Sequence, residues 1–302
     1  MRGPTASESL LAPRNLAAFV LVSVIWGGTW LVIRDQLESV APQWSITYRF
    51  IIAAAGMFAL AALRGERLLL APGGQRWALI LGLFQFTLNF VFVYNAERFI
   101  TSGLVAVMFA LLVVPNALLG RAFLGQPIRR EFVIGSIIAA SGVALLFWQE
   151  WQVSPASLED VLLGVALTAG GIMSASFANI AQALEGARRQ PFLSLLAWSM
   201  VWGVVINTLA ALITAGPPSF DPRPSYALGI LYLGLLGSCV TFPLYYGLVR
   251  KVGAGQAAYS SVIVPIVAMV LSTVFEGFRW GLVPAAGAAL TLGGMVIALR
   301  GR

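Results

Sequence analysis

Long apolar segments separated by short polar ones occur along the whole chain. Segments of about 18 residues or more recur between residues 16 and 299, and a helix of that length spans about 30 Å of hydrocarbon. Inside a bilayer only helices and closed barrels pair all of their backbone groups, and unbroken apolar segments indicate helices. The pattern therefore predicts an all-α integral membrane protein.

Ten transmembrane helices are expected from these segments. Their predicted ranges are 16–33, 44–63, 77–96, 101–120, 132–148, 161–181, 192–214, 226–248, 257–275 and 281–299. Residues 77–120 are almost continuously apolar, but one helix of that length would measure about 66 Å, so Glu97 and Arg98 mark a turn. Arg250 and Lys251, followed by Gly-Ala-Gly, mark another turn in the same way.

Charged residues are few and unevenly distributed. Only 10% of the 302 residues are charged, against about 25% in soluble domains. Of the nineteen Lys and Arg, fourteen fall on the side of the amino terminus, four fall on the other side and Arg49 lies within the second predicted helix. The positive-inside rule then places both termini, including the polar segment 1–15, in the cytoplasm. The same bias explains the net charge of +7 without nucleic-acid binding.

The second half of the chain repeats the first. The matched residues, at offsets of 150 to 152, are Gly82 with Gly234, Asn89 with Thr241, Gly103 with Gly253, Pro115 with Pro265, Gln126 with Glu276, Gly135 with Gly287 and Gly142 with Gly294. Because five helices is an odd number, the second copy enters the membrane upside down. The sequence therefore predicts one membrane domain built from two inverted five-helix repeats, 16–148 and 160–299, an arrangement characteristic of secondary transporters.

The matched prolines interrupt apolar segments. Pro115 lies in AVMFALLVVPNALL and Pro265 in QAAYSSVIVPIVAM, and proline in a helix interior costs about 3 kcal/mol. One interpretation is a pair of symmetry-related hinges at which each half bends. The other is that they only kink their helices, because proline is common in membrane helices.

Several stretches match a known family in their order along the chain. They are VSVIWGGTWLVIR in the first helix, TYRFIIAA in the second, and LYLGLLGSCVTFPLYYGLVRKVGAGQAAYSSVIVP from the eighth into the ninth. In these features the chain resembles the drug/metabolite transporter superfamily, and its EamA-type ten-helix exporters in particular. The resemblance implies a transporter of the bacterial inner membrane that exports amino acids or related metabolites, similar to the aromatic amino-acid exporters. The usual Leu-Gly-Glu of the family after the fourth helix is Leu-Gly-Gln here, at Gln126, while the second copy keeps an acid at Glu276.

The residue types that the chain lacks limit the enzymes and the kinds of substrate that are compatible with it. The chain has no histidine and a single cysteine, Cys239, and no acid lies deep in a predicted helix. A serine–histidine protease, a histidine-ligated metal site and a buried acid pair are therefore excluded, and we expect neither an enzyme nor a cofactor or metal. Proton-driven exporters of cations generally need an intramembrane carboxylate, and phosphorylated substrates need a cation in the cavity. Arg49 is available for that role, although its long side chain can instead snorkel to the outer interface.

Uncharged polar and aromatic residues are the candidates for substrate binding. They are Trp26, Trp30, Gln85, Asn89, Phe109, Ser174, Asn179, Thr241, Tyr245 and Tyr259. Aromatic rings can wall a pocket for flat, partly apolar ligands, and an amide in lipid must be paired or face a cavity. The alternatives are hydrogen bonds between helices for Gln85, Asn89 and Thr241, and a place in the interfacial aromatic belt for Trp and Tyr.

Glycine and alanine are concentrated in the fifth and tenth predicted helices, which favours close packing there as a scaffold or a dimer contact. Together these features predict a transporter that exports small neutral or zwitterionic metabolites by alternating access, with amino acids, aromatic ones included, as the expected substrates. The alternatives are an exporter of other neutral metabolites or drugs, and a passive channel. The expected partners are the substrate and membrane lipid; the sequence does not fix the oligomeric state, and a monomer is compatible with it.

Overall fold

The computed structural model describes residues 9–153, 157–252 and 259–300, and every element in these ranges is helical. In chain order the elements are α1 (Pro13–Gln36), α2 (Pro42–Leu63), α3 (Gly74–Leu83), η1 (Phe84–Leu88), α4 (Asn89–Ala96), α5 (Ser102–Phe109), η2 (Ala110–Leu112), α6 (Val113–Leu124), α7 (Arg130–Val153), α8 (Leu158–Ala183), α9 (Glu185–Arg188), α10 (Phe192–Thr214), α11 (Pro224–Leu231), η3 (Tyr232–Val240), α12 (Thr241–Val252), α14 (Ser260–Phe275) and α15 (Leu282–Arg300). Here η1 and η3 are π-helical and η2 is a 3₁₀ turn.

Helices lie at all ten predicted positions. In the described part of the chain, nine of them are long and apolar enough to cross a membrane, and α14 is a shorter apolar helix of 16 residues. The turn predicted at Glu97 and Arg98 is confirmed, because α4 ends at Ala96 and α5 begins at Ser102. The predicted start of the ninth helix at residue 257, and Gly253 before it, lie outside the described residues. The chain is a multi-pass membrane protein.

Proline and serine set the beginnings of several helices. Pro13, Pro42 and Pro224 occupy the first turns of α1, α2 and α11, where the missing N–H costs nothing because it would have no partner inside the helix. Ser157 and Asp160 form a reciprocal capping box at the start of α8, which satisfies two more of these free N–H groups. Local chemistry therefore places these helix starts independently of hydrophobicity.

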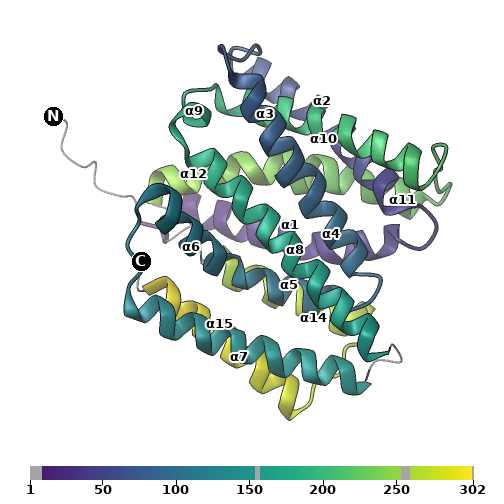
Figure 1. Cartoon of the computed structure of the whole chain (residues 1–302), viewed down its shortest axis with the longest axis vertical. Helices are drawn as coiled ribbons and strands as arrows, with labels where there is room; N and C mark the ends of the chain where they lie inside the picture. The colour runs from purple at the N-terminus through teal and green to yellow at the C-terminus, as the bar shows by residue number, and fades with distance from the viewer. Residues whose placement is uncertain (1–8, 154–156, 253–258, 301–302) are drawn as a thin grey trace.

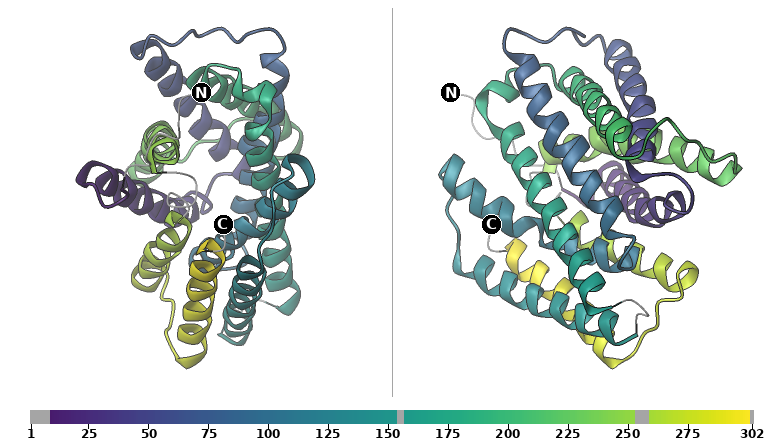
Figure 2. Two further views of the ribbon diagram at one scale, coloured as in Figure 1. Left: turned by 90° about the vertical axis from the view of Figure 1, so that its left-hand side faces the viewer. Right: turned by 45° about the vertical axis from the view of Figure 1, so that its right-hand side comes forward.

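The contacts between helices follow an inverted two-fold pattern. Each of three contacts has a counterpart between the repeat-related segments. The contact of α3 with α10 corresponds to that of η3 with α2. The contact of α4 with α8 corresponds to that of α12 with α1, and the contact of α1 with α14 corresponds to that of α6 with α8. Three further contacts, α2 with α10, α5 with α14 and α7 with α15, join a helix to its own repeat partner. In Figure 1 the pair α7–α15 forms one edge of the molecule and α2–α10 the opposite edge, and Figure 2 shows the same division from two other directions.

Matched glycines make the close contacts of this arrangement. A methyl group on Gly82 would lie 2.8 Å from the carbonyl oxygen of Ser199, and one on Gly234 would lie 3.0 Å from that of Arg49. Between α7 and α15, a side chain on Gly135 would overlap the backbone of Gly294. The predicted close packing of these last two helices is confirmed, and it is a contact within the chain.

Repeat-related helices also share an irregularity. The π-helical element η1 lies in the third transmembrane segment, and η3 lies in the eighth, its repeat partner. A shift of 152 residues carries Phe84–Leu88 onto residues 236–240, which are part of η3. Such wide turns are frequently found at functional sites, so they direct attention to the space between these two segments.

Candidate functional site

Trp26 of α1 is in contact with the eighth transmembrane segment. Its indole Nε1 donates a hydrogen bond to the carbonyl oxygen of Gly237, 3.3 Å away. The ring centre lies 5.8 Å from that of Phe242 and 5.2 Å from that of Tyr245. The structure therefore brings together two of the predicted site residues, Trp26 and Tyr245, on facing helices.

Trp30, one turn further along α1, forms a second aromatic pair. Its ring centre lies 5.0 Å from that of Phe109 at the end of α5. The edge of the Phe109 ring also reaches Gly171 of α8, where a methyl group would lie 3.3 Å from the ring and 3.4 Å from the carbonyl oxygen of Asn89. Gly171 thus borders the Phe109 ring and the backbone of Asn89, while Trp30 is connected to this point through Phe109. The Nε1 atom of Trp30 is buried and has no hydrogen-bond partner among the described residues.

Gln85 and Asn89 are both buried on the third transmembrane segment, at 9% and 5% exposure. Gln85 lies inside η1 and Asn89 directly follows it. In the part of the chain that the structure describes, the Oδ1 atom of Asn89 accepts no hydrogen bond. A buried amide oxygen without a donor is costly, so Asn89 is suited to accept a hydrogen bond from a ligand.

Ser174, Asn179 and Thr241 use their polar groups within the helix bundle. The Ser174 hydroxyl donates to the Gly170 carbonyl oxygen at 2.9 Å, and the Thr241 hydroxyl donates to that of Gly237 at 2.8 Å. The Asn179 side-chain amide donates to Asn116 Oδ1 at 3.3 Å, which links α8 to α6. The first two bonds stay within one transmembrane segment, and the Asn179–Asn116 bond joins two helices.

Tyr259 lies apart from the Trp30–Phe109 pair. It is the first described residue after the gap before α14, and it packs against two small apolar clusters, one with Phe19, Leu248 and Val252 and one with Val262. Tyr259 shares the cluster of Phe19 with Tyr245, which contacts Trp26. The aromatic pocket expected from Trp26, Trp30, Phe109 and Tyr259 stays a prediction.

Arg49, for which the sequence left two interpretations, is buried in the structure. The interpretation that it snorkels to the membrane surface is wrong, because the side chain is only 3% exposed. Its guanidinium carbon lies 4.3 Å from the centre of the Phe90 ring and 5.3 Å from that of Phe50. The phenols of Tyr94 and Tyr232 are also close enough to interact with it electrostatically. Helix α2 directs this arginine inward, across the bundle.

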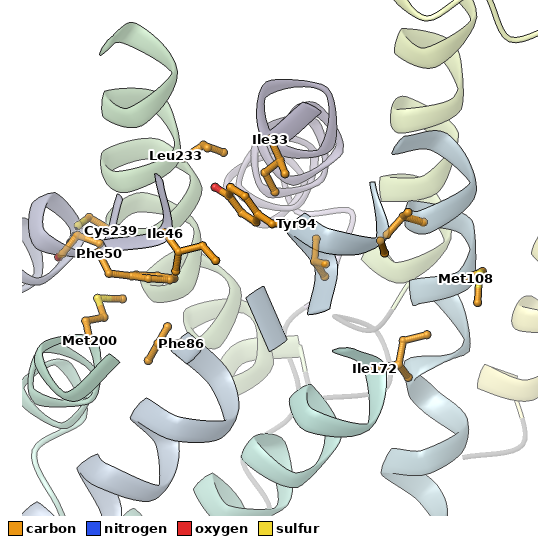
Figure 3. Packing of buried hydrophobic residues seen from close by; sticks show 14 of the residues in the cluster. Ile33, Ile46, Phe50, Phe86, Tyr94, Met108, Ile172, Met200, Leu233 and Cys239 are labelled. Atoms are coloured by element: carbon orange, nitrogen blue, oxygen red, sulfur yellow. Dashed lines mark hydrogen bonds between the residues drawn. The ribbon is translucent and has the colours of Figure 1, made fainter. Parts of the chain in front are cut away.

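Gly237 of η3 borders the arginine and Thr29 of α1. A methyl group on Gly237 would lie 3.7 Å from Arg49 Nη2 and 3.1 Å from a methyl group of Thr29. The carbonyl oxygen of the same glycine accepts the Trp26 hydrogen bond. Figure 3 shows the apolar surroundings, with Phe50 beside Ile46 and Phe86, and Tyr94 toward Ile33 and Leu233. The arginine therefore lies next to the predicted aromatic residues of α1.

The two matched prolines have different surroundings. Pro115 is the third residue of α6 and follows the 3₁₀ turn η2, as expected where the ring clashes with the preceding turn. Pro265 is buried within α14, which continues through it as an α-helix. The hinge role of both prolines stays a prediction.

The sequence profile of the EamA-like transporter family matches the chain twice, over residues 14–148 and 162–300. The chain belongs to this family. It is 27% identical over 267 residues to PagO of Salmonella typhimurium (strain LT2), covering 86% of this chain and 84% of PagO. It is 28% identical over 271 residues to YedA of Escherichia coli (strain K12), named as an uncharacterized inner membrane transporter, covering 88% of this chain and 84% of YedA.

One protein of known crystal structure has the same fold as this EamA-like transporter. It superposes with a TM-score of 0.69 at 19% identity, over 94% of this chain and 96% of that one. The family and the names of its members describe transporters, which are not a class of enzyme.

The two halves of the transporter are joined at the membrane side opposite the start of α1, here called the far side. The backbone N–H and the hydroxyl of Ser102, at the start of α5, both donate to Glu276, the former at 3.3 Å. Arg223 pairs with Asp221 at 2.7 Å, with Asp35 at 3.6 Å and with Glu38. Glu276 and Arg223 belong to the second half, and their partners Ser102, Asp35 and Glu38 to the first. The acid that the second copy retains thus holds the helix start of the other copy.

A second carboxylate supports the same helix start, and a third is buried beside it. Glu150 of α7 accepts hydrogen bonds from the backbone N–H and the hydroxyl of Thr101, at 3.1 and 3.3 Å. Glu97, just after α4, is 0% exposed, and neither of its oxygens has a hydrogen-bond partner among the described residues. Burial, and then the charge of Glu276, raise the pKa of Glu97 well above the usual value, against the smaller opposing effect of Arg34.

Proposed function

We propose that this transporter moves small neutral or zwitterionic metabolites out of the cytoplasm, with amino acids, aromatic ones included, as its substrates. The observation that carries the proposal is the Trp30–Phe109 ring pair, whose Phe109 lies beside Gly171 and so next to the backbone of Asn89. An aromatic pair offers an apolar surface for a flat side chain. The unpaired Asn89 Oδ1 offers an acceptor for an ammonium group.

Alternating access is supported by the inverted contacts between the halves. Two near-equal units can exchange conformations and expose a central site first to one side and then to the other. In the present arrangement Glu276 and Arg223 tie the halves together at the far side. Opening toward that side requires these contacts to break, while Trp26 and Trp30 stay on α1 as the wall of the central site.

The proposed direction of transport rests on orientation. The excess of Lys and Arg on the side of the amino terminus favours a cytoplasmic location for both ends of the chain. The far side would then face outward. The name of the relative YedA supports the bacterial inner membrane as the location.

Uptake into proteoliposomes tests the proposal. Labelled phenylalanine, threonine and glutamate are offered to the reconstituted protein with and without a pH gradient. Saturable uptake of phenylalanine and threonine that is indifferent to the gradient is expected, because no acid deep in a helix is available to carry a proton. The protein should also show counterflow, in which unlabelled substrate inside the liposomes accelerates entry of the label.

Two results would contradict the proposal in different ways. If folded protein takes up none of the three amino acids, the substrate is another neutral metabolite or a drug, and the amino-acid assignment is withdrawn. If uptake is neither saturable nor accelerated by internal substrate, the protein is a passive channel and alternating access is withdrawn.

A further inference from the structure

The charge of Arg49 is buried without a counterion. Among the basic residues whose side chains the structure describes, it alone is buried, at 3% exposure. The ion pairs found in the described ranges involve Arg189 and Arg223, not Arg49. A guanidinium stays charged in a protein, and an unpaired buried charge is strongly unfavourable. The energetics therefore call for an anion at this position.

The aromatic neighbours of Arg49 satisfy only part of its bonding capacity. The rings of Phe90 and Phe50 attract the cation through their faces. Two of its three nitrogen atoms, Nε and Nη1, still have no hydrogen-bond partner among the described residues. The Tyr94 phenol, which donates to Gln36 Oε1 at 3.1 Å, also interacts with the guanidinium through its oxygen, and the Tyr232 phenol donates to the Ile25 carbonyl oxygen at 2.8 Å, but a phenol is neutral and does not balance the charge. Free N–H groups of a guanidinium are the groups that a carboxylate binds best.

The arginine lies in the same core as the candidate substrate residues. Phe90, which it contacts, directly follows Asn89 in α4. Gly237 links Arg49 to α1. A methyl group on Gly237 would lie 3.7 Å from Arg49 Nη2, and the Gly237 carbonyl oxygen accepts a hydrogen bond from Trp26. Phe90, Phe109 and Trp30 all pack against the one large apolar cluster that contains Phe50 and Tyr94.

We propose that Arg49 binds the carboxylate of the transported molecule, so that each substrate carries a single carboxylate, as phenylalanine and threonine do. This inference rests on the proposed transport function and narrows its substrate class. A single buried cation matches a single anionic group, and it gives zwitterions and simple carboxylic acids an advantage over amines, amides and esters of the same shape. Asn89 supplies the acceptor for the ammonium group when the substrate has one.

Ligands that differ only in the charged group test this inference. Purified full-length protein is titrated with phenylalanine, phenylalaninamide and 3-phenylpropionate, and binding is followed by the rise in unfolding temperature and by inhibition of phenylalanine counterflow. In the wild type, both carboxylates should bind at least about tenfold more tightly than the amide, as expected for hydrogen bonds to a charged group.

Variants of Arg49 show whether this preference comes from the arginine. In Arg49→Gln the acid-to-amide ratio should fall to about one, while Arg49→Lys should keep part of it, because a point charge replaces the planar fork. Since the ratio is measured within one variant, it does not depend on how much protein folds. Arg76→Gln, which removes an exposed arginine of α3, should keep the wild-type ratio.

The outcomes separate the inference from the proposed function. If the wild type transports phenylalanine but binds the amide equally well, or if Arg49→Gln keeps the preference for acids, the carboxylate site is disproved and the transport function remains. If phenylalanine is not transported but carboxylates stabilise the protein in an Arg49-dependent way, the site stands and the amino-acid assignment is disproved. If neither effect is found, both are disproved.

Discussion

The guanidinium of Arg49 lies over the face of the Phe90 ring, 4.3 Å from its centre, in the interior of a membrane protein. The ring lowers the cost of burying the charge, but it cannot replace the hydrogen bonds that water would have made. In the empty protein this position is therefore a source of instability that a bound anion removes.

Arg49→Met should make the empty protein more stable and the transporter inactive. Replacing buried charge by an apolar side chain of similar volume often stabilises a protein by about 1 kcal/mol or more. The unfolding temperature in detergent should rise, while the further rise caused by phenylalanine in the wild type should vanish. An unfolding temperature below that of the wild type would show that the charge has stabilising partners.

Trp30→Ala should weaken the binding of aromatic substrates selectively. The variant loses the ring contact with Phe109, and aromatic pairs contribute about 0.5–1.5 kcal/mol beyond their buried area. The concentration for half-maximal uptake of phenylalanine should rise by about tenfold in proteoliposomes, with a smaller effect on threonine. Trp148→Ala is the matched control, since Trp148 is exposed and contacts Trp151. Equal effects of the two substitutions, or equal effects on both substrates, would contradict the aromatic site.

Adjacent glycines of α15 should respond in opposite ways to alanine. A methyl group on Gly294 would meet the backbone of Gly135 and Ala139, whereas nothing lies within 4 Å of one on Gly293. Gly294→Ala should lower the free energy of unfolding by about 1–3 kcal/mol, as overpacking does. Gly293→Ala should leave it unchanged or raise it slightly, because alanine is the better helix former. Thermal unfolding of both variants provides the measurement, and similar stabilities would mean that α7 and α15 are not closely packed.

Stability should fall as pH rises through the range in which Glu97 loses its proton. The raised pKa means that the folded protein keeps this proton at pH values where the unfolded chain, with a Glu pKa of about 4.3, has already lost it. The folded state then binds more protons, so the free energy of unfolding decreases with rising pH across that window. Glu97→Gln mimics the protonated form and should flatten the profile above about pH 4.3, the pKa of a Glu in the unfolded chain, measured by thermal unfolding.

The neighbouring charges provide the control for this pH effect. Glu276 and Arg34 act on Glu97 from the other elements packed there, and both are kept in Glu97→Gln. Glu131→Gln, which removes an exposed acid at the start of α7, should keep the wild-type profile. A wild-type slope that survives in Glu97→Gln would assign the effect to another group.

The positions of the helices and their close contacts could be predicted from the sequence. Apolar length alone fixes a membrane helix, and the repeat offset identified Gly135, Gly142, Gly287 and Gly294 before their contacts were seen. The direction of Arg49 could not be predicted, because α2 is apolar on nearly all sides and gives no periodic signal for its inward face. The neighbours of Arg49 on the eighth segment are Gly234, which lies against the Arg49 backbone, and Gly237, which borders Nη2.

The π-helical turns are a second reason why the sequence did not predict which way some side chains face. A π-helical turn shifts the residues after it by one position relative to an α-helix. The sequence of η1, FQFTL at residues 84–88, contains no feature that predicts such a turn. Residues after that turn, Phe90 and Tyr94 among them, therefore face in directions that α-helical periodicity does not give. Tyr259 could not be placed by sequence either, since its small neighbours gave no measure of its depth.

Three helix pairs, α2 with α10, α5 with α14 and α7 with α15, each join a segment to its own counterpart in the other half. Two identical five-helix units lying antiparallel would form the same three contacts, since each would present one surface to its mate, as in a two-fold dimer. In a single chain the two units need not be identical, and Gln126 with Glu276, and Asn89 with Thr241, are matched positions at which they differ.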